Sequence, residues 1–227
     1  MSARGERAEP LLALVHVPKT AGTTLTRLMR YHYRGGRFLT SGNIFSRFEQ
    51  VEAKLREIQG KTHIAAVAGH FTVGLADQAL PHARRMTILR DPVERTLSHY
   101  YSLVQPRVGR TRAAGPAIIP PWLPLPAPGL TLAETLGEHS YIPDNLQTRM
   151  LCGIVSPYDP LPPDALEQAK RNVRERFAFV GTTERFSEFL ALLNLELCWP
   201  TVAYNSYKVH AMRPRKGLAA GDVEVVE

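Results

Sequence analysis

The chain has 227 residues, which is enough to bury a sizeable core, and we expect one domain over 1–227. Its 44% hydrophobic and 22% charged residues are typical of a soluble globular protein. The net charge of +7 favours an anionic partner. Nucleic acid is excluded as that partner, because the basic residues are dispersed and no helix-turn-helix, zinc-finger or RNA-binding signature occurs.

The N-terminal segment, residues 1–10, is charged and is expected to be flexible. The apolar run after it is too short to span a membrane and a loop interrupts it, so we expect no stable membrane insertion. Because no secretory signal is visible, Cys152 and Cys198 are expected to be buried thiols rather than a disulfide. Their spacing also lacks the pattern of a metal site.

Residues 11–24 carry the most informative pattern in the chain. An apolar run from Leu11 to Val17, which contains His16, predicts a strand that stops at Pro18. A loop with a lysine, a glycine and several threonines follows, and then a helical pattern begins. Backbone N–H groups and the positive end of the helix dipole meet at such a helix start, where they bind a phosphate or sulfate ester. The alternative is an ordinary strand–helix turn that holds no ligand.

This loop differs from the Walker loop of nucleotide triphosphatases, because Lys19 precedes Gly22 and no glycine lies before it. Residues 17–24, Val-Pro-Lys-Thr-Ala-Gly-Thr-Thr, instead resemble the 5′-phosphosulfate loop of sulfotransferases that use 3′-phosphoadenosine-5′-phosphosulfate (PAPS). With His16 included, they are most similar to the carbohydrate group that contains the heparan sulfate 2-O- and 6-O-sulfotransferases and their bacterial relatives. The resemblance implies that Lys19 stabilises the departing phosphate and that the loop holds the 5′-phosphate through Thr20, Ala21, Gly22, Thr23 and Thr24.

Two helices are predicted between this loop and the next motif. The first carries an apolar stripe of Leu25, Leu28 and Met29 and frays near residues 35–36. The second ends near residue 60 and has apolar residues at helical spacing, namely Phe48, Val51, Leu55 and Ile58.

His70 is the candidate base. The apolar run Ile64–Ala68 predicts a buried parallel strand, and His70 emerges at its carboxyl end, the edge where open α/β sheets bind ligands. Sulfuryl transfer needs a group that removes the proton of the acceptor hydroxyl, and histidine titrates in the useful range. In the resembling family a histidine after the corresponding strand has this role. The alternative is a structural histidine bonded to a neighbouring loop carbonyl.

A second anion-binding site is predicted around Arg90 and Ser98. We call it the second grip, and the loop around Lys19 the first grip. Met86–Leu89 is expected to be a short buried strand, and a helix follows it with Asp91 as N-cap and Pro92 at the first position. Arg90 and Ser98 are eight residues apart, about two helical turns, so both can face one pocket and bind a phosphate monoester. This stretch resembles the 3′-phosphate motif of the family. The alternative makes Arg90 a salt-bridge partner and Ser98 a solvated residue.

Residues 106–130 contain seven prolines together with apolar side chains, and we expect them to form a flap over the acceptor side. The alternative is a loop that touches nothing. Thr131–Glu134 has the pattern of a capping box, which predicts the start of another helix. Residues 144–151 resemble a further block of the family, in which Gln147 and Arg149 could project towards the substrate, although a structural role fits each of them equally well.

The last third continues the α/β pattern. A helix is expected after Asp164, its N-cap, and Phe179–Val180 is expected to be the next strand. In the resembling family the following turn lies by the adenine, which makes Thr182 and Thr183 candidates for cofactor contacts, while helix capping by Thr183 is the alternative. Residues 205–208 and 213–217 resemble the late loop that often folds over the nucleotide in relatives.

We therefore predict an α/β fold, a P-loop-like three-layer sandwich with a central parallel sheet flanked by helices. The resemblance implies in-line transfer of the sulfuryl group from PAPS to an acceptor hydroxyl, most simply of a carbohydrate, with release of 3′,5′-bisphosphoadenosine (PAP) and no metal. An ATP-dependent P-loop phosphotransferase and an inactive nucleotide- or polyanion-binding protein are the alternatives. Animal members of the group are anchored in the Golgi membrane; here we expect no anchor, and a bacterial-type cytoplasmic protein.

Overall fold

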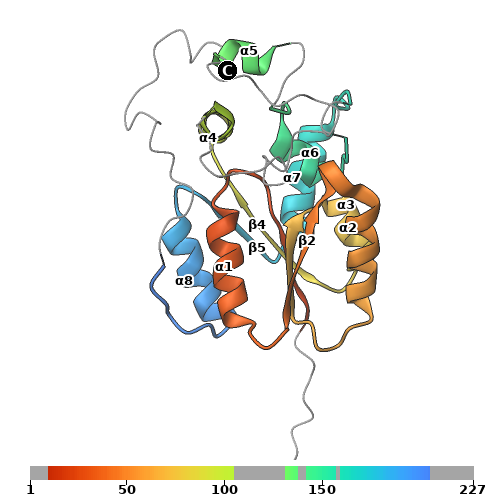
Figure 1. The fold of residues 1–227 in the computed structure, drawn as a ribbon, viewed down its shortest axis with the longest axis vertical. Coiled ribbons are helices and arrows are strands. Elements are labelled where there is room, and N and C mark those ends of the chain that lie inside the picture. The colour runs from red at the N-terminus through yellow and green to blue at the C-terminus, as the bar shows by residue number, and fades with distance from the viewer. Residues whose placement is uncertain (1–9, 105–130, 138–141, 157–158, 205–227) are drawn as a thin grey trace, which may run out of the picture.

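The computed structural model describes residues 10–104, 131–137, 142–156 and 159–204 (Figure 1). Within these ranges, five strands form one sheet in the order β2-β3-β1-β4-β5, and every neighbouring pair is parallel. The strands are β1 (Leu12–Val15), β2 (Phe38–Asn43), β3 (Ala66–His70), β4 (Arg84–Leu89) and β5 (Phe179–Thr182). The predicted α/β fold with a central parallel sheet is confirmed.

The helices connect these strands and cover both faces of the sheet (Figure 1). In the described part of the chain they are α1 (Gly22–His32), α2 (Ile44–Gln59), α3 (Val73–Ala79), α4 (Pro92–Val104), α5 (Leu132–Leu136), α6 (Leu146–Cys152), α7 (Ala165–Arg176) and α8 (Phe186–Glu196). Figure 1 shows α4 beyond the carboxyl ends of the strands and not against a face of the sheet.

The central strand β1 shows why the molecule has three layers. All four of its residues are buried, as expected for a strand that is covered on both faces. Successive side chains point to opposite faces. Ala13 and Val15 pack in one core with residues of α2, α3 and α6, whereas Leu12 and Leu14 pack in a second core with residues of α1 and α8. The sheet is thus the middle layer between two groups of helices.

The strand order places a topological switch at β1. The chain leaves β1 towards β2 and β3 on one side, and then crosses to β4 and β5 on the other. In open α/β sheets, ligands bind outside the carboxyl ends of the strands at such a switch point. The loops after β1, β3 and β4 all begin at this edge, and they carry the site described below.

Two elements were missed by the sequence analysis. The strand β2 is an edge strand of sequence Phe-Leu-Thr-Ser-Gly-Asn, whose polar residues hide the pattern and whose register shifts between Thr40 and Gly42. The helix α3 has only seven residues, and the hydroxyl of Thr72 caps it by accepting from the N–H of Leu75 at 3.3 Å. Such a short helix gives little periodicity to detect.

Two strand boundaries also differ from the predictions. The strand β3 runs to His70, so this histidine ends the strand instead of following it. The strand β1 ends at Val15, so His16 lies just beyond the strand and not within it. Both histidines lie at the carboxyl edge of the sheet, as predicted for His70.

The predicted helix starts are largely confirmed. The carboxylate of Asp91 accepts from the N–H of Glu94 at 2.9 Å at the start of α4, and the capping box of Thr131 and Glu134 is present at α5. Asp164 occupies the N-cap position of α7, but its side chain makes no capping hydrogen bond. Of the cysteines, Cys152 is half-buried, while Cys198 is exposed, contrary to the prediction; both are free thiols.

The proline-rich segment 106–130, most of the N-terminal segment and residues 205–217 lie outside the described residues. The predictions made for them therefore remain predictions. No helix in the described ranges is both long and apolar enough to cross a membrane.

Candidate active site

Three adjacent strands deliver the three main candidate residues to one edge of the sheet. Lys19 lies in the loop after β1, His70 is the last residue of β3, and Arg90 directly follows β4. Because β1 pairs with both β3 and β4, these residues come from neighbouring strand ends. The sequence separations are large, and the sheet order alone brings the residues together.

The cradle loop, residues 17–24, is tightly curled. Lys19 and Ala21 both adopt left-handed backbone conformations, with φ of 73° and 63°. The hydroxyl of Thr20 donates to the carbonyl of Val17 at 2.8 Å, and the N–H of Thr24 donates to the carbonyl of Ala21 at 2.9 Å. Left-handed conformations in residues other than glycine cost roughly 1–2 kcal/mol each. Such strain is concentrated at ligand sites, and alternating backbone hands of this kind form anion-binding concavities.

The ring of His16 fills the space beside the start of α1. A Cβ atom built on Gly22 would lie 2.0 Å from Cδ2 of that ring, so only glycine fits at this position. The backbone N–H of His16 donates to the carbonyl of Gly69 at 2.9 Å, which ties the cradle loop to β3. His16 is therefore a packing residue between the cradle loop and the histidine at the end of β3.

His70 is held in a defined orientation by the same residue. Its Nδ1 lies 2.6 Å from the carbonyl oxygen of His16, and the two rings are 4.2 Å apart between centroids. Because a carbonyl oxygen can only accept, Nδ1 carries the hydrogen in this contact, and the lone pair of the neutral ring is on Nε2. The loop-carbonyl bond expected for a structural histidine is thus present, and it also selects the tautomer with a basic Nε2.

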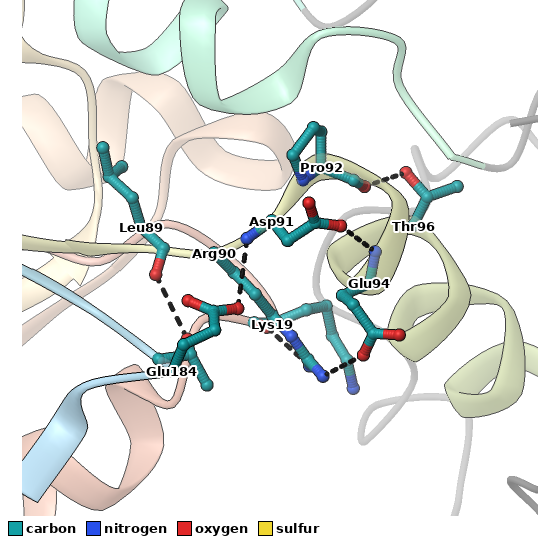
Figure 2. Close-up of polar contacts among 9 residues, drawn as sticks. Lys19, Leu89, Arg90, Asp91, Pro92, Glu94, Thr96 and Glu184 are labelled. Atoms are coloured by element: carbon teal, nitrogen blue, oxygen red, sulfur yellow. Dashed lines mark hydrogen bonds and ion pairs between the residues drawn. The ribbon is translucent and has the colours of Figure 1, made fainter. Parts of the chain in front are cut away.

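Arg90 points towards the cradle loop. Its Nη1 donates to the carbonyl of Lys19 at 3.4 Å, and its Nη2 forms an ion pair with Glu94 at 3.0 Å. Figure 2 shows the guanidinium between these two residues. Ser98 lies two turns along α4 and is buried, with 6% of its surface exposed. The structure therefore brings the first predicted grip, around Lys19, into contact with the second, around Arg90.

Gln147 forms two contacts with the backbone of Arg90 that the sequence analysis did not predict. Its Oε1 accepts from the backbone N–H of Arg90 at 2.9 Å, and its Nε2 donates to the carbonyl of Arg90 at 2.7 Å. This amide holds the backbone from which the Arg90 side chain leaves. Arg149 is buried and binds the carboxylate of Asp144 and the carbonyl of Asp159, so the structural alternative applies to it.

Thr182 and Thr183 lie at the carboxyl end of β5, beside the strand that leads to Arg90. Both the N–H and the hydroxyl of Thr183 donate to the carbonyl of Leu89, at 2.8 and 3.2 Å. Thr183 does not cap α8, because the N-cap of that helix is Arg185. Thr182 is exposed. A further contact joins this turn to the junction of β4 and α4 around residues 90–95, which we call the Arg90 corner. The carboxylate of Glu184 accepts from the N–H of Asp91 at 3.2 Å (Figure 2).

The electrostatics of the corner are unusual at Arg95, in the first turns of α4. Burial, and secondly the positive charge of Arg90, lower the pKa of Arg95 to about 10. The sequence analysis missed this residue, since nothing in the helical pattern distinguishes a buried arginine from a solvated one. Across the described ranges, no cluster of histidine, cysteine and carboxylate side chains could hold a metal ion.

The chain matches a known family over its first half. Residues 8–120 match the family model of the sulfotransferase family. The matched region contains the cradle loop, His70, and the helix with Arg90 and Ser98, so the coarser part of the resemblance is confirmed and sulfuryl transfer is supported as the activity. No curated protein matches the chain.

Proposed function

We propose that the protein transfers the sulfuryl group of PAPS to a hydroxyl group of a carbohydrate acceptor. The observation that carries this proposal is the contact of the Arg90 guanidinium with the carbonyl of Lys19 at 3.4 Å. It supports a ligand with two separate anionic groups, one in the cradle loop and one between the loop and α4. PAPS has this form, with a phosphosulfate on its 5′ side and a phosphate on its 3′ side.

The residues of the two grips have different roles in this proposal. Lys19 neutralises the negative charge that builds on the bridging oxygen as the sulfur–oxygen bond breaks. Backbone amides of residues 20–24, with the hydroxyls of Thr23 and Thr24, hold the 5′-phosphate at the start of α1. Arg90 and Ser98 bind the 3′-phosphate, and Thr182 and Thr183 border the adenine. Reactions of this type depend on positioning and on stabilisation of charge, as in phosphoryl transfer.

His70 completes the reaction as general base. The acceptor oxygen attacks sulfur in line with the departing phosphate oxygen, and Nε2 of His70 takes the proton of the acceptor hydroxyl. The hydrogen bond from Nδ1 to the carbonyl of His16 supports this role, because it holds the ring in the tautomer that can accept there.

Two other functions make different predictions. A phosphotransferase would turn over ATP with magnesium, whereas Lys19 is not at the position that a Walker loop requires. A binding protein without activity would retain PAP but transfer nothing.

Calorimetry with PAP, followed by incubation with sulfur-labelled PAPS and a panel of sugars, separates these functions. PAP binding together with labelled sugar supports the proposal. PAP binding with no transfer to any sugar favours the inactive binding protein, and magnesium-dependent hydrolysis or transfer from ATP favours the phosphotransferase. Absence of PAP binding contradicts the proposed donor.

A further inference from the structure

Arg95 is a buried cation that the described residues leave without a counter-ion. It lies in α4 and has 3% of its surface exposed. Its Nη1 is buried and has no hydrogen-bond partner among the described residues, while its Nη2 donates to the hydroxyl of Thr96 at 3.3 Å. A guanidinium offers five N–H donors, so most of its capacity is unused.

The acidic side chains of this corner are engaged elsewhere. Asp91 caps α4 at the N–H of Glu94, Glu94 pairs with Arg90, and Glu184 accepts from the N–H of Asp91. The charge that acts on Arg95 is the positive charge of Arg90. With a pKa of about 10, Arg95 is still protonated at neutral pH. Removing a cation from water without an anion is unfavourable, so an anion that binds beside Arg95 would be stabilised by its charge.

A second buried arginine shows what the fold does where a guanidinium is only structural. Arg85 has 8% of its surface exposed, and its Nη2 contacts Asp77 at 3.0 Å and the carbonyl of Leu80 at 3.2 Å. Arg85 therefore has a counter-ion among the described residues, although its Nε is buried without a hydrogen-bond partner there. The contrast indicates that the counter-ion of Arg95 comes from outside the described residues.

We propose that Arg95 is a binding residue for the 3′-phosphate of the donor, as a second guanidinium beside Arg90. Arg95 lies three residues before Ser98 and on the same face of α4. A phosphate monoester carries about 1.5 to 2 negative charges at neutral pH, and Arg90 already shares its charge with Glu94. Arg95 supplies a second positive charge, which neutralises the phosphate charge that Arg90 leaves unbalanced. This inference rests on the proposed function, because it assigns a residue to the same donor site.

Calorimetry with two ligands tests this role. PAP and 5′-AMP differ only by the 3′-phosphate, so their affinity ratio reports on that group. For Arg95→Met we expect PAP binding to weaken by about 10- to 100-fold, the range for loss of a charged hydrogen bond, and 5′-AMP binding to change less than twofold. Arg85→Met is the matched control, and it should leave the affinity ratio unchanged.

Thermal unfolding of the unliganded proteins provides a second readout. Arg95→Met removes an unpaired charge and should unfold at the wild-type temperature or above. Arg85→Met removes the buried contacts with Asp77 and with the carbonyl of Leu80, and should unfold at a lower temperature. Equal losses of PAP and 5′-AMP affinity in Arg95→Met, or none, would overturn the inference.

If Arg95→Met does not fold, Arg95→Lys decides the question. Lysine keeps the charge but loses the fork of donors, so we expect an intermediate loss of PAP affinity. Full retention of the PAP preference in Arg95→Lys also counts against the role. If instead the wild-type protein shows no preference for PAP over 5′-AMP, the proposed donor itself is wrong, and this outcome is distinct from a failure of Arg95 alone.

Discussion

Glu94 holds Arg90 in the unliganded protein, and an incoming phosphate has to compete with this carboxylate. The ion pair is 3.0 Å long, and 44% of the Glu94 side chain is exposed, so its contribution is of the order of 0.5–1 kcal/mol. We therefore expect Glu94→Gln to bind PAP about 2- to 5-fold more tightly by calorimetry. Glu52→Gln, which breaks the i,i+4 pair with Arg56 in α2, is the control and should have no effect. Weaker PAP binding in Glu94→Gln would instead show that Glu94 orients Arg90 for its ligand.

Lys19 and His70 are expected to act on the chemical step. A positioned donor or charge at a reacting centre contributes about 3–4 kcal/mol to the barrier. Lys19→Ala and His70→Ala should each reduce turnover of PAPS by roughly a hundredfold or more. His70→Ala should keep its PAP affinity, since the proposed mechanism places His70 against the acceptor and not against the nucleotide. Wild-type turnover in His70→Ala would remove it as the base.

The packing of Gly22 against His16 can be tested by a pair of substitutions. In Gly22→Ala the new Cβ and the His16 ring would occupy the same space, and overpacking of this kind costs roughly 1–3 kcal/mol. The free energy of unfolding in urea should fall accordingly. In a protein that also carries His16→Ala the clash is gone, so Gly22→Ala should then cost little, and the two changes should be strongly non-additive. Additive losses would mean that the ring does not occupy this space.

The helix α6 acts on the site through one side chain. Gln147 forms two hydrogen bonds with the backbone of Arg90, and thereby joins α6 to the junction of β4 and α4. We expect Gln147→Leu to lower the free energy of unfolding by about 1 kcal/mol, because it leaves partly buried backbone groups of Arg90 without partners. PAP affinity should fall as well, while 5′-AMP affinity should not. Thr148→Ala, one residue along the same helix, is the control and should preserve the preference for PAP.

The elements that could be predicted are those that depend on interactions between residues close in sequence. Apolar runs identified β1 and β4, and the capping residues Asp91 and Thr131 identified the starts of α4 and α5. The strand β2 was missed, because an edge strand with polar residues has no apolar run. The left-handed backbone conformations of Lys19 and Ala21 could not be predicted either. Glycine is the residue that indicates such a conformation in a sequence, and neither residue is a glycine.

For the whole molecule, the candidate site depends on strand order. Arg90 and Lys19 are 71 residues apart in sequence, and they meet because β4 pairs with β1. Local patterns do not encode this order, so the motifs indicated two grips at one edge of the sheet but not the contact between Arg90 and the carbonyl of Lys19. The roles of Gln147, Glu94 and Arg95 could not be predicted for the same reason, because each depends on contacts between elements or on burial.

A ligand that spans both grips should stabilise the protein as a whole. Binding at about one hundred times the dissociation constant adds about 2.7 kcal/mol to the free energy of unfolding. For a chain of 227 residues, this corresponds to a rise in melting temperature of about 5–11 °C with PAP, measured by scanning calorimetry. At the same concentration, 5′-AMP reaches one grip only and should give a smaller shift. In Arg90→Ala the PAP shift should fall to the 5′-AMP value, because the second grip is lost. A PAP shift that survives in Arg90→Ala would mean that the 3′-phosphate binds elsewhere, and the contact between Arg90 and the cradle loop would then serve only to hold the loop.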